Sequence, residues 1–282
     1  MARSKTAAVA PARKPKKQYK LLFMVLPFMV IVLLFNYVPI FGWIYSVFDY
    51  VPGVPILECD FMGLDYFKMI IKDANVIRAL KNTFIFAGIS IILTPLPMIF
   101  AILLNELRGK VFKSAVQTIS YIPHFLSVVV ICSMLNGFGS TTGLFNDVRD
   151  LLGMARVDMN NGSQYFLPLY LGSQVWQTVG WSSIMYLSAL SNVDVTLYDV
   201  ANIDGANRWQ KIKNIIWPTI KPTTTILLIM NLGNVLNSDY TKILLMQNDT
   251  NRSQLEVIGT FVYQKGIVEG KFSYAAAVNL FI

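Results

Sequence analysis

The stretch that decides the fold runs from Asp194 to Pro222 and reads DVTLYDVANIDGANRWQKIKNIIWPTIKP. It is a polar segment between two strongly apolar runs. Each ionised side chain in it would cost roughly 2.5 to 3.5 kcal/mol at the centre of a bilayer, so the segment is predicted to lie outside the lipid. The ionised residues that carry this argument are Asp199, Asp204, Arg208, Lys211 and Lys213.

The same segment has the pattern of two short helices. Asp194 or Thr196 is placed to cap a first helix, and Gly205 supplies a stop. A second helix is expected from about Ala206 to Trp217, ended by two prolines. Hinged helices of this kind would suit the docking of a cytoplasmic partner. An amphipathic loop resting on lipid headgroups explains the pattern equally well. The second helix would place Trp209, Ile212, Ile215 and Ile216 together, with Pro218 and Pro222 after them.

Composition indicates an all-α, polytopic membrane protein. Of the 282 residues, 54% are hydrophobic and 14% are charged, whereas soluble domains carry about 25% charged residues. The formal charge of +8 could suggest nucleic acid, but the basic residues form no single patch, so no nucleic-acid partner is expected. Cys59 and Cys132 are too far apart to indicate a disulfide framework or a zinc site.

Hydropathy predicts a disordered basic tail over residues 1–20 and a single transmembrane domain over residues 21–282. The last apolar run has only about ten residues, against about 20 needed to cross a bilayer, so a truncated sixth span is expected. The segment 194–222 would join the fourth and fifth spans. The predicted spans are 21–45, 82–104, 114–135, 164–187, 223–240 and, incomplete, 273–282.

The distribution of basic residues orients this topology. Fourteen of the 24 Lys and Arg residues fall in the N-terminal tail, in the loop that contains Arg108, and in the segment 194–222. Because cytoplasmic loops carry an excess of Lys and Arg, all three are predicted to be cytoplasmic. The chain is therefore expected to be multi-pass in a plasma membrane, with its N-terminus inside.

Motifs for catalysis and nucleotide binding are absent from the sequence. It contains no Gly-x-x-x-x-Gly-Lys-Ser/Thr phosphate loop, no Gly-x-Ser-x-Gly elbow and no His-Glu-x-x-His pair. His124 is the only histidine, and no serine is marked as its nucleophile. We therefore expect no catalytic residues, no metal site and no cofactor in this chain. An intramembrane enzyme acting through His124 ranks third among the functions considered.

Polar and aromatic residues inside the predicted spans suggest a path for a solute. Counting 1.5 Å per residue into the third predicted span places His124 near the bilayer midplane. Polar groups at such depth are expected to face the bundle interior or a wet cavity. Interhelical hydrogen bonding is the competing explanation for any one of them. The candidates for the path are Tyr121, His124, Trp176, Gln177, Trp181, Asn231, Asn234 and Asn237.

The segment 194–222 resembles the EAA loop of binding-protein-dependent ABC importer permeases. The likeness lies in Asp-Val-Ala-x-x-Asp-Gly-Ala over residues 199–206, with Asp199 where the family commonly has Glu. The resemblance implies that these residues form coupling helices that dock on an ATPase subunit, with Trp209 and Ile212 as buried anchors. The coupling residues so implied are Asp199, Ala201, Asp204, Gly205, Ala206, Trp209, Ile212, Ile215 and Pro218.

The likeness extends along most of the chain, to the permeases that serve complex oligosaccharides. It rests on short motifs such as Asn-Tyr-Val-Pro at 36–39, Leu-Leu-Asn-Glu at 103–106, Gln-Thr-Ile-Ser-Tyr-Ile-Pro-His-Phe at 117–125 and Tyr-Ala-Ala-Ala at 274–277. The resemblance implies a six-span type I ABC importer fold in a bacterial inner membrane. Relatives of this branch end with a complete sixth span.

The resemblance also implies a set of partners. They are a second permease of different sequence, two ATPase subunits that carry ATP and magnesium, an extracytoplasmic solute-binding protein, an oligosaccharide and membrane lipid. The rival class is a self-sufficient channel or a scaffold protein with no ATPase partner. Recovery of the chain with an ATPase subunit would favour the importer, and conductance of the chain alone would favour the channel.

Overall fold

The computed structural model describes residues 19–107, 109–161, 163–233 and 240–281. Within these ranges every named element is helical, and one isolated antiparallel bridge joins Phe48 and Phe61. The α-helices are α1 (Tyr19–Val32), α2 (Asp65–Lys72), α3 (Ala74–Leu93), α4 (Pro95–Glu106), α5 (Lys110–Tyr121), α6 (Val128–Gly139), α7 (Leu144–Leu151), α8 (Ser163–Ser191), α9 (Val195–Ile203), α10 (Arg208–Lys211), α11 (Trp217–Gly233), α12 (Tyr240–Met246), α13 (Arg252–Leu255), α14 (Ile258–Tyr263) and α15 (Phe272–Phe281).

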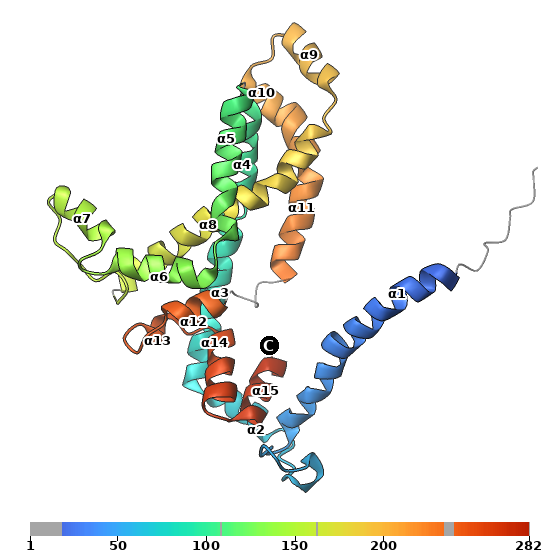
Figure 1. Cartoon of the computed structure of the whole chain (residues 1–282), viewed down its shortest axis with the longest axis vertical. Coiled ribbons are helices and arrows are strands. Elements are labelled where there is room, and N and C mark those ends of the chain that lie inside the picture. The colour runs from blue at the N-terminus through green and yellow to red at the C-terminus, as the bar shows by residue number, and fades with distance from the viewer. Residues whose placement is uncertain (1–18, 108, 162, 234–239, 282) are drawn as a thin grey trace, which may run out of the picture.

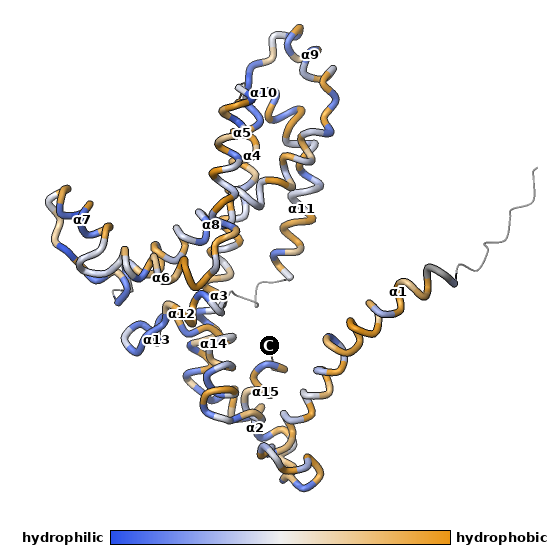
Figure 2. Tube along the Cα trace, in the orientation of Figure 1, coloured by the Kyte–Doolittle hydropathy of each residue, from blue (hydrophilic) through white to orange (hydrophobic). Residues whose placement is uncertain are grey.

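The N-terminal helix stands apart from the rest of the chain (Figure 1). Helix α1 passes through a π-helical turn into a 3-10 helix that ends at Val47, so the helical run covers the predicted first span. Every side chain described from Leu22 to Ile40 is exposed, and Figure 2 shows that this helix is mostly hydrophobic. The 3-10 part of this run packs on α15, whereas the exposed apolar part before it requires lipid or another subunit around it.

Three described helical segments are long and apolar enough to cross a membrane, namely Leu22–Val47, Ala74–Glu106 and Val128–Leu151. The second begins eight residues before the predicted span at 82, because Asp73 caps α3. Its carboxylate oxygen accepts the backbone N–H of Asn75 at 2.9 Å. Helix α8 covers the predicted fourth span and extends it to Ser191.

The predicted third span, 114–135, is not one helix. Helix α5 ends at Tyr121, a 3-10 turn follows over Ile122–Phe125, and Leu126 and Ser127 are extended before α6 begins. Pro123 opens the 3-10 turn and has no N–H to donate to the preceding turn, which favours a break at this point. The depth of His124, counted along a continuous span, was therefore wrongly derived.

Three apolar clusters hold the helices together. The first joins α3, α6, α8 and α12, and its members include Phe86, Ile131, Phe166 and Ile243. The second joins α2, α3, α14 and α15, and the third joins α4, α8 and the segment that leads into α11. Residues 240–271 lie between the predicted fifth and sixth spans. They contribute side chains to two of these clusters, to the first from α12 and to the second from α14.

Candidate coupling loop and transport path

Helix α9 begins and ends as its sequence predicts. The Asp194 carboxylate accepts the backbone N–H of Thr196 at 2.9 Å, which supplies the N-cap. This bond lowers the pKa of Asp194 below its ordinary value. At the other end Gly205 has φ of +69°, and the Ala206 N–H reaches back to the Ala201 carbonyl at 2.8 Å. That six-to-one bond is a Schellman motif, which requires a left-handed residue at this point.

A second cap immediately starts the next helix. The Asn207 side chain accepts the Gln210 N–H at 2.9 Å, and the Gln210 side chain accepts the Asn207 N–H at 2.8 Å. This reciprocal capping box places the cap, Asn207, only two residues after the glycine and starts α10 at Arg208, so the direction of the chain changes sharply there. The hinge at Gly205 is thereby fixed by a backbone hydrogen bond on the α9 side and by two bonds between side chains and backbone on the α10 side.

The second helix is much longer than the sequence indicates. Helix α10 continues through a π-helical segment, Ile212–Ile216, into α11, and so runs without interruption from Arg208 to Gly233. The prediction that Pro218 and Pro222 end it was wrong. The Trp217 N–H bonds to the Ile212 carbonyl, one residue further back than in an α-helix. A π turn directly before Pro218 lets the helix absorb the missing donor.

The tip of the loop exposes apolar side chains. Ile203 at the end of α9 is 85% exposed and Trp209 in α10 is 71% exposed, so the prediction that Trp209 is a buried anchor was wrong for this chain alone. Asp199, Asp204 and Pro218 are also exposed. Figure 1 shows α9 and α10 at one end of the molecule, beyond the helices that they join. Large apolar side chains exposed at such a tip indicate a protein or a membrane surface against it.

The base of the loop is packed firmly into the helical bundle. Ile216 and Ile220 are fully buried against Ala101 of α4 and Tyr186 of α8. Ile212, the other predicted anchor, is half-buried and packs on the same cluster. The helix that begins with α10 is therefore in direct contact with α4 and α8. The remaining predicted coupling residues, Ala201, Ala206 and Ile215, are half-buried.

A cavity of about 550 Å³ lies among α3, α4, α8 and α11. Its wall combines aromatic rings with hydroxyl and amide groups, and it includes two of the predicted path residues, Trp181 and Asn231. Aromatic faces beside a few convergent polar groups are the usual composition of a site for a polar organic ligand. The polar groups of the wall are those of Ser90, Thr94, Gln174, Thr178, Ser182 and Asn231.

His124 reaches this cavity only through a neighbour. Its ring stacks on Trp181 with 4.6 Å between ring centroids and 4° between planes, and Phe125 meets the same indole edge-on at 5.3 Å. His124 therefore holds the orientation of Trp181 and does not itself line the wall.

The other predicted path residues divide into two groups. Tyr121, Trp176 and Gln177 are not part of the cavity wall, and Trp176 is half exposed on the outside of α8. Asn234 and Asn237 lie outside the residues that the structure describes. The structure therefore brings Trp181, His124 and Asn231 together at the cavity and leaves Tyr121, Trp176 and Gln177 away from it.

A buried lysine behind the cavity was missed from the sequence. Lys242 of α12 is fully buried, its Nζ lies 3.4 Å from Gln174 Oε1, and it stands 5.2 Å over the Tyr170 ring. Gln174 and Tyr170 both belong to the cavity wall. The apolar run of residues 243–246, next to this lysine, was the signal that α12 enters the bundle.

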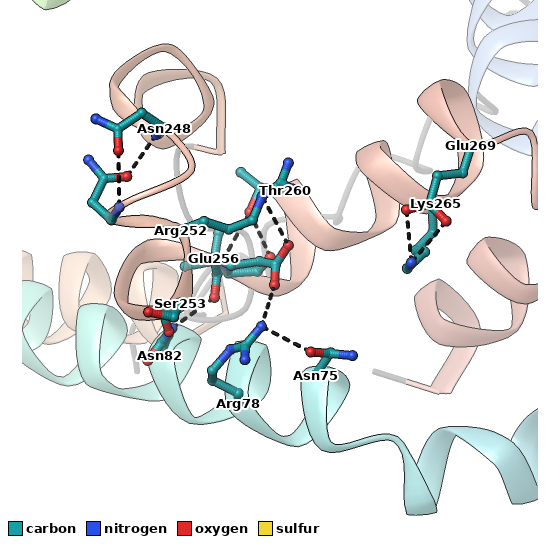
Figure 3. Close-up of polar contacts among 12 residues, drawn as sticks. Asn75, Arg78, Asn82, Asn248, Arg252, Ser253, Glu256, Thr260, Lys265 and Glu269 are labelled. Atoms are coloured by element: carbon teal, nitrogen blue, oxygen red, sulfur yellow. Dashed lines mark hydrogen bonds and ion pairs between the residues drawn. The ribbon is translucent and has the colours of Figure 1, made fainter.

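A polar cluster fixes the C-terminal helices onto α3 (Figure 3). Arg78 Nη2 contacts Glu256 Oε2 at 3.2 Å, and Asn82 Nδ2 donates to the Glu256 carbonyl at 3.0 Å. The Glu256 side chain is only 7% exposed, and Arg252 Nε is 3.9 Å from its other oxygen. A nearly buried carboxylate between two arginines needs at least one of them close by.

Replacing Arg78 with alanine is expected to destabilise the fold by about 1 to 2 kcal/mol. This is less than the cost of breaking a fully buried pair, because Arg78 is 40% exposed and Arg252 remains. Thermal unfolding in lipid nanodiscs measures the change. Lys68→Ala removes the exposed pair with Asp65 and is the matched control, with almost no expected effect. Equal unfolding temperatures for the two variants would contradict this prediction.

Comparison with known proteins agrees with these features. Residues 93–264 match the family described as "Binding-protein-dependent transport system inner membrane component". The chain is 37% identical over 269 residues to the polygalacturonan/rhamnogalacturonan transport system permease protein YteP of Bacillus subtilis, covering 94% of this chain and 83% of that protein. It is 30% identical to the arabinooligosaccharides transport system permease protein AraP of the same organism, covering 90% of this chain and 80% of AraP.

A solved structure is similar over nearly the whole chain. In the crystal structure of a bacterial alginate ABC transporter in complex with alginate pentasaccharide-bound periplasmic protein, one chain matches with a TM-score of 0.87 and 33% identity. The match covers 94% of this chain and 89% of that one. The fold is therefore the all-helical type I ABC importer permease fold. The chain belongs to the family of inner membrane components of binding-protein-dependent transport systems.

Proposed function

We propose that this protein is the permease subunit of an ABC importer that takes up an oligosaccharide or a polysaccharide fragment. The main support is the cavity among α3, α4, α8 and α11. Its Trp181 ring can stack on a sugar, and its hydroxyl and amide groups can form hydrogen bonds with sugar hydroxyls. The relatives named for polygalacturonan, arabinooligosaccharides and alginate support the same class of solute.

The tip formed by α9 and α10 docks on an ATPase subunit in this proposal. Its exposed Ile203 and Trp209 enter the partner's surface, and the hinge at Gly205 fixes the angle between the two helices. Asp199 and Asp204 flank the same surface. Closure of the ATPase dimer on ATP then pushes α10, and the buried Ile216 and Ile220 carry the push into the bundle.

The remaining partners follow from the surfaces that the single chain leaves uncovered. A second permease of different sequence covers apolar faces such as that of α1, and a binding protein delivers the solute on the side opposite α9 and α10. The N-terminus and the α9–α10 tip are cytoplasmic, in agreement with the excess of Lys and Arg there. The chain performs no catalysis, and ATP and magnesium are held by the ATPase subunits.

Co-expression with a second permease and an ATPase subunit tests the proposal. The reconstituted complex is expected to hydrolyse ATP several-fold faster when an oligosaccharide-loaded binding protein is added. Only the loaded binding protein is expected to shift the permeases toward the state in which the ATPase subunits close. The empty binding protein is the control. Ion conductance by the purified chain alone, with no association with an ATPase, would overturn the proposal.

A further inference from the structure

A second and larger cavity lies at the end of the molecule opposite α9 and α10. Its volume is about 790 Å³, and it is formed by the turn at residues 49–52, by α2 and by the start of α15. Figure 1 places α2 and α15 far from the tip of the coupling loop. This cavity shares no wall residue with the one that contains Trp181. Its size falls in the range of small-molecule sites, roughly 300 to 1,000 Å³.

Aromatic rings make up much of its wall. Tyr50 meets Phe272 edge-on at 6.3 Å between centroids, and Tyr66 lies 6.3 Å from Tyr274. The Tyr50 backbone N–H donates to Ser273 Oγ at 2.8 Å, which fixes the turn against α15. Flat rings held in this way offer apolar faces with polar edges, the surface on which a pyranose ring can lie.

Two carboxylates stand beside these rings and orient them. Tyr66 donates its hydroxyl to Asp49 at 2.7 Å, and Tyr274 donates to Asp73 at 2.7 Å. Burial alone would raise the pKa of Asp73, but bonds from Tyr274 and from the backbone of Asn75 lower it overall. Each carboxylate can accept about four hydrogen bonds, so acceptor capacity remains for sugar hydroxyls.

Lysines complete the rim of the cavity. Lys265 and Lys271 hold Glu269 between them at 2.8 and 3.0 Å, and Figure 3 shows the first of these contacts. Lys72, in the last turn of α2, also lines this cavity and is exposed. Ammonium donors and carboxylate acceptors beside aromatic rings match the alternating hydroxyls of a sugar, and an ammonium group also suits a uronate carboxylate.

We propose that this cavity, bounded by Tyr50, Tyr66, Asp49, Asp73 and Lys72, is an entry subsite that holds one sugar unit of the oligosaccharide before the unit reaches the inner cavity. The inference rests on the proposed function, which places this end of the molecule outside the cytoplasm. It adds a saccharide site on the permease itself, at the face where the binding protein releases its load. Tyr50 provides the stacking face, and Lys72 binds a hydroxyl or carboxylate.

The test uses Tyr50→Ala in the complete transporter. Loss of one stacking ring is expected to raise the KM for uptake about five- to tenfold at an unchanged maximal rate. Tyr50→Phe retains the ring and the backbone bond to Ser273, so it is expected to restore the wild-type KM. Tyr37→Ala removes an exposed tyrosine that is not part of this cavity and serves as the control. An unchanged KM in Tyr50→Ala would overturn the subsite.

Direct binding keeps the test decisive if Tyr50→Ala folds poorly. Saturation-transfer NMR on the complex in nanodiscs uses trigalacturonate and maltotriose as probes, and both are expected to bind the wild type. Lys72→Gln is expected to weaken the binding of trigalacturonate and to leave the binding of maltotriose unchanged. If the wild-type complex binds trigalacturonate and Lys72→Gln leaves this binding unchanged, the saccharide is held elsewhere and the assignment is overturned. Retention of an anionic phospholipid that Tyr50→Ala releases would also overturn it, in favour of a lipid site.

These outcomes separate the subsite from the proposed function. If the wild-type complex transports no saccharide, the proposed function fails. If it transports saccharide and Tyr50→Ala behaves as wild type in both assays, the proposed function stands and only the entry subsite fails.

Discussion

Replacing Gly205 with valine is expected to reduce uptake, and the ATPase activity linked to it, by roughly five- to thirtyfold. Gly205 has φ of +69°, and an L-residue pays about 1 to 2 kcal/mol there, more when it is β-branched. Every 1.4 kcal/mol lowers the population of the native hinge tenfold. The hydrogen bond from the Ala206 N–H to the Ala201 carbonyl then breaks, and the angle between α9 and α10 is no longer fixed. Transport assays on proteoliposomes, with ATP hydrolysis measured in parallel, give the result.

The control for this change is Gly153→Val. Gly153 follows α7, has φ of +72°, and, like Gly205, has no atom within 4 Å of an added Cβ. The backbone strain that valine introduces is therefore similar at Gly153 and Gly205, but Gly153 lies away from the coupling loop. Both variants are expected to insert in the membrane at wild-type levels. Equal losses of transport in the two variants would show that strain alone, and not the hinge, causes the defect.

Replacing Gly180 with leucine is expected to prevent stable folding of the bundle. A Cβ at this position would clash with the Ser120 carbonyl oxygen and would lie 2.6 Å from the carbonyl carbon and 2.8 Å from the Ser120 Cβ, so α5 and α8 leave no room for a side chain at this crossing. Close contacts at small residues are how membrane helices pack. A leucine forces the helices apart at a cost of roughly 3 kcal/mol or more, and it displaces the stacked His124 and Trp181.

Gly172 provides the matched control in the same helix. It is exposed, and no atom lies within 4 Å of an added Cβ, so Gly172→Leu is expected to fold like the wild type. Size-exclusion chromatography in detergent, followed by thermal unfolding, compares the two. A monodisperse Gly180→Leu protein that unfolds at the temperature of Gly172→Leu would show that α5 and α8 are not held at this crossing.

The sequence predicts the first helix of the coupling loop well because local rules govern it. An acidic cap at Asp194 and a glycine at 205 determine where α9 begins and ends, whatever the rest of the chain does. The helical class and the first and fourth helices likewise follow from long apolar runs. These features depend only on residues that are close together along the chain, so they can be predicted from one sequence without knowledge of the tertiary contacts.

Features that depend on contacts between distant segments were not predictable in the same way. Pro218 and Pro222 read as stops, yet the packing of Ile216 and Ile220 on α4 and α8 keeps the helix continuous across them. Lys242 reads as a residue of an outer loop, although Gln174, sixty-eight positions earlier, stands beside it in the bundle. The proximity of these two residues depends on how the helices pack, and no local sequence pattern reveals it.

The long helix from Arg208 to Gly233 acts as a lever. It is held near its middle by Ile216 and Ile220, which lie about ten residues from Arg208 and about thirteen from Asn231, or roughly 15 and 20 Å at 1.5 Å per residue. In the proposed transport cycle, a push on the Arg208 arm would tilt the helix about these contacts and move Asn231 the opposite way by a slightly larger distance. The cavity that Asn231 lines would then change shape in the same motion that moves the loop.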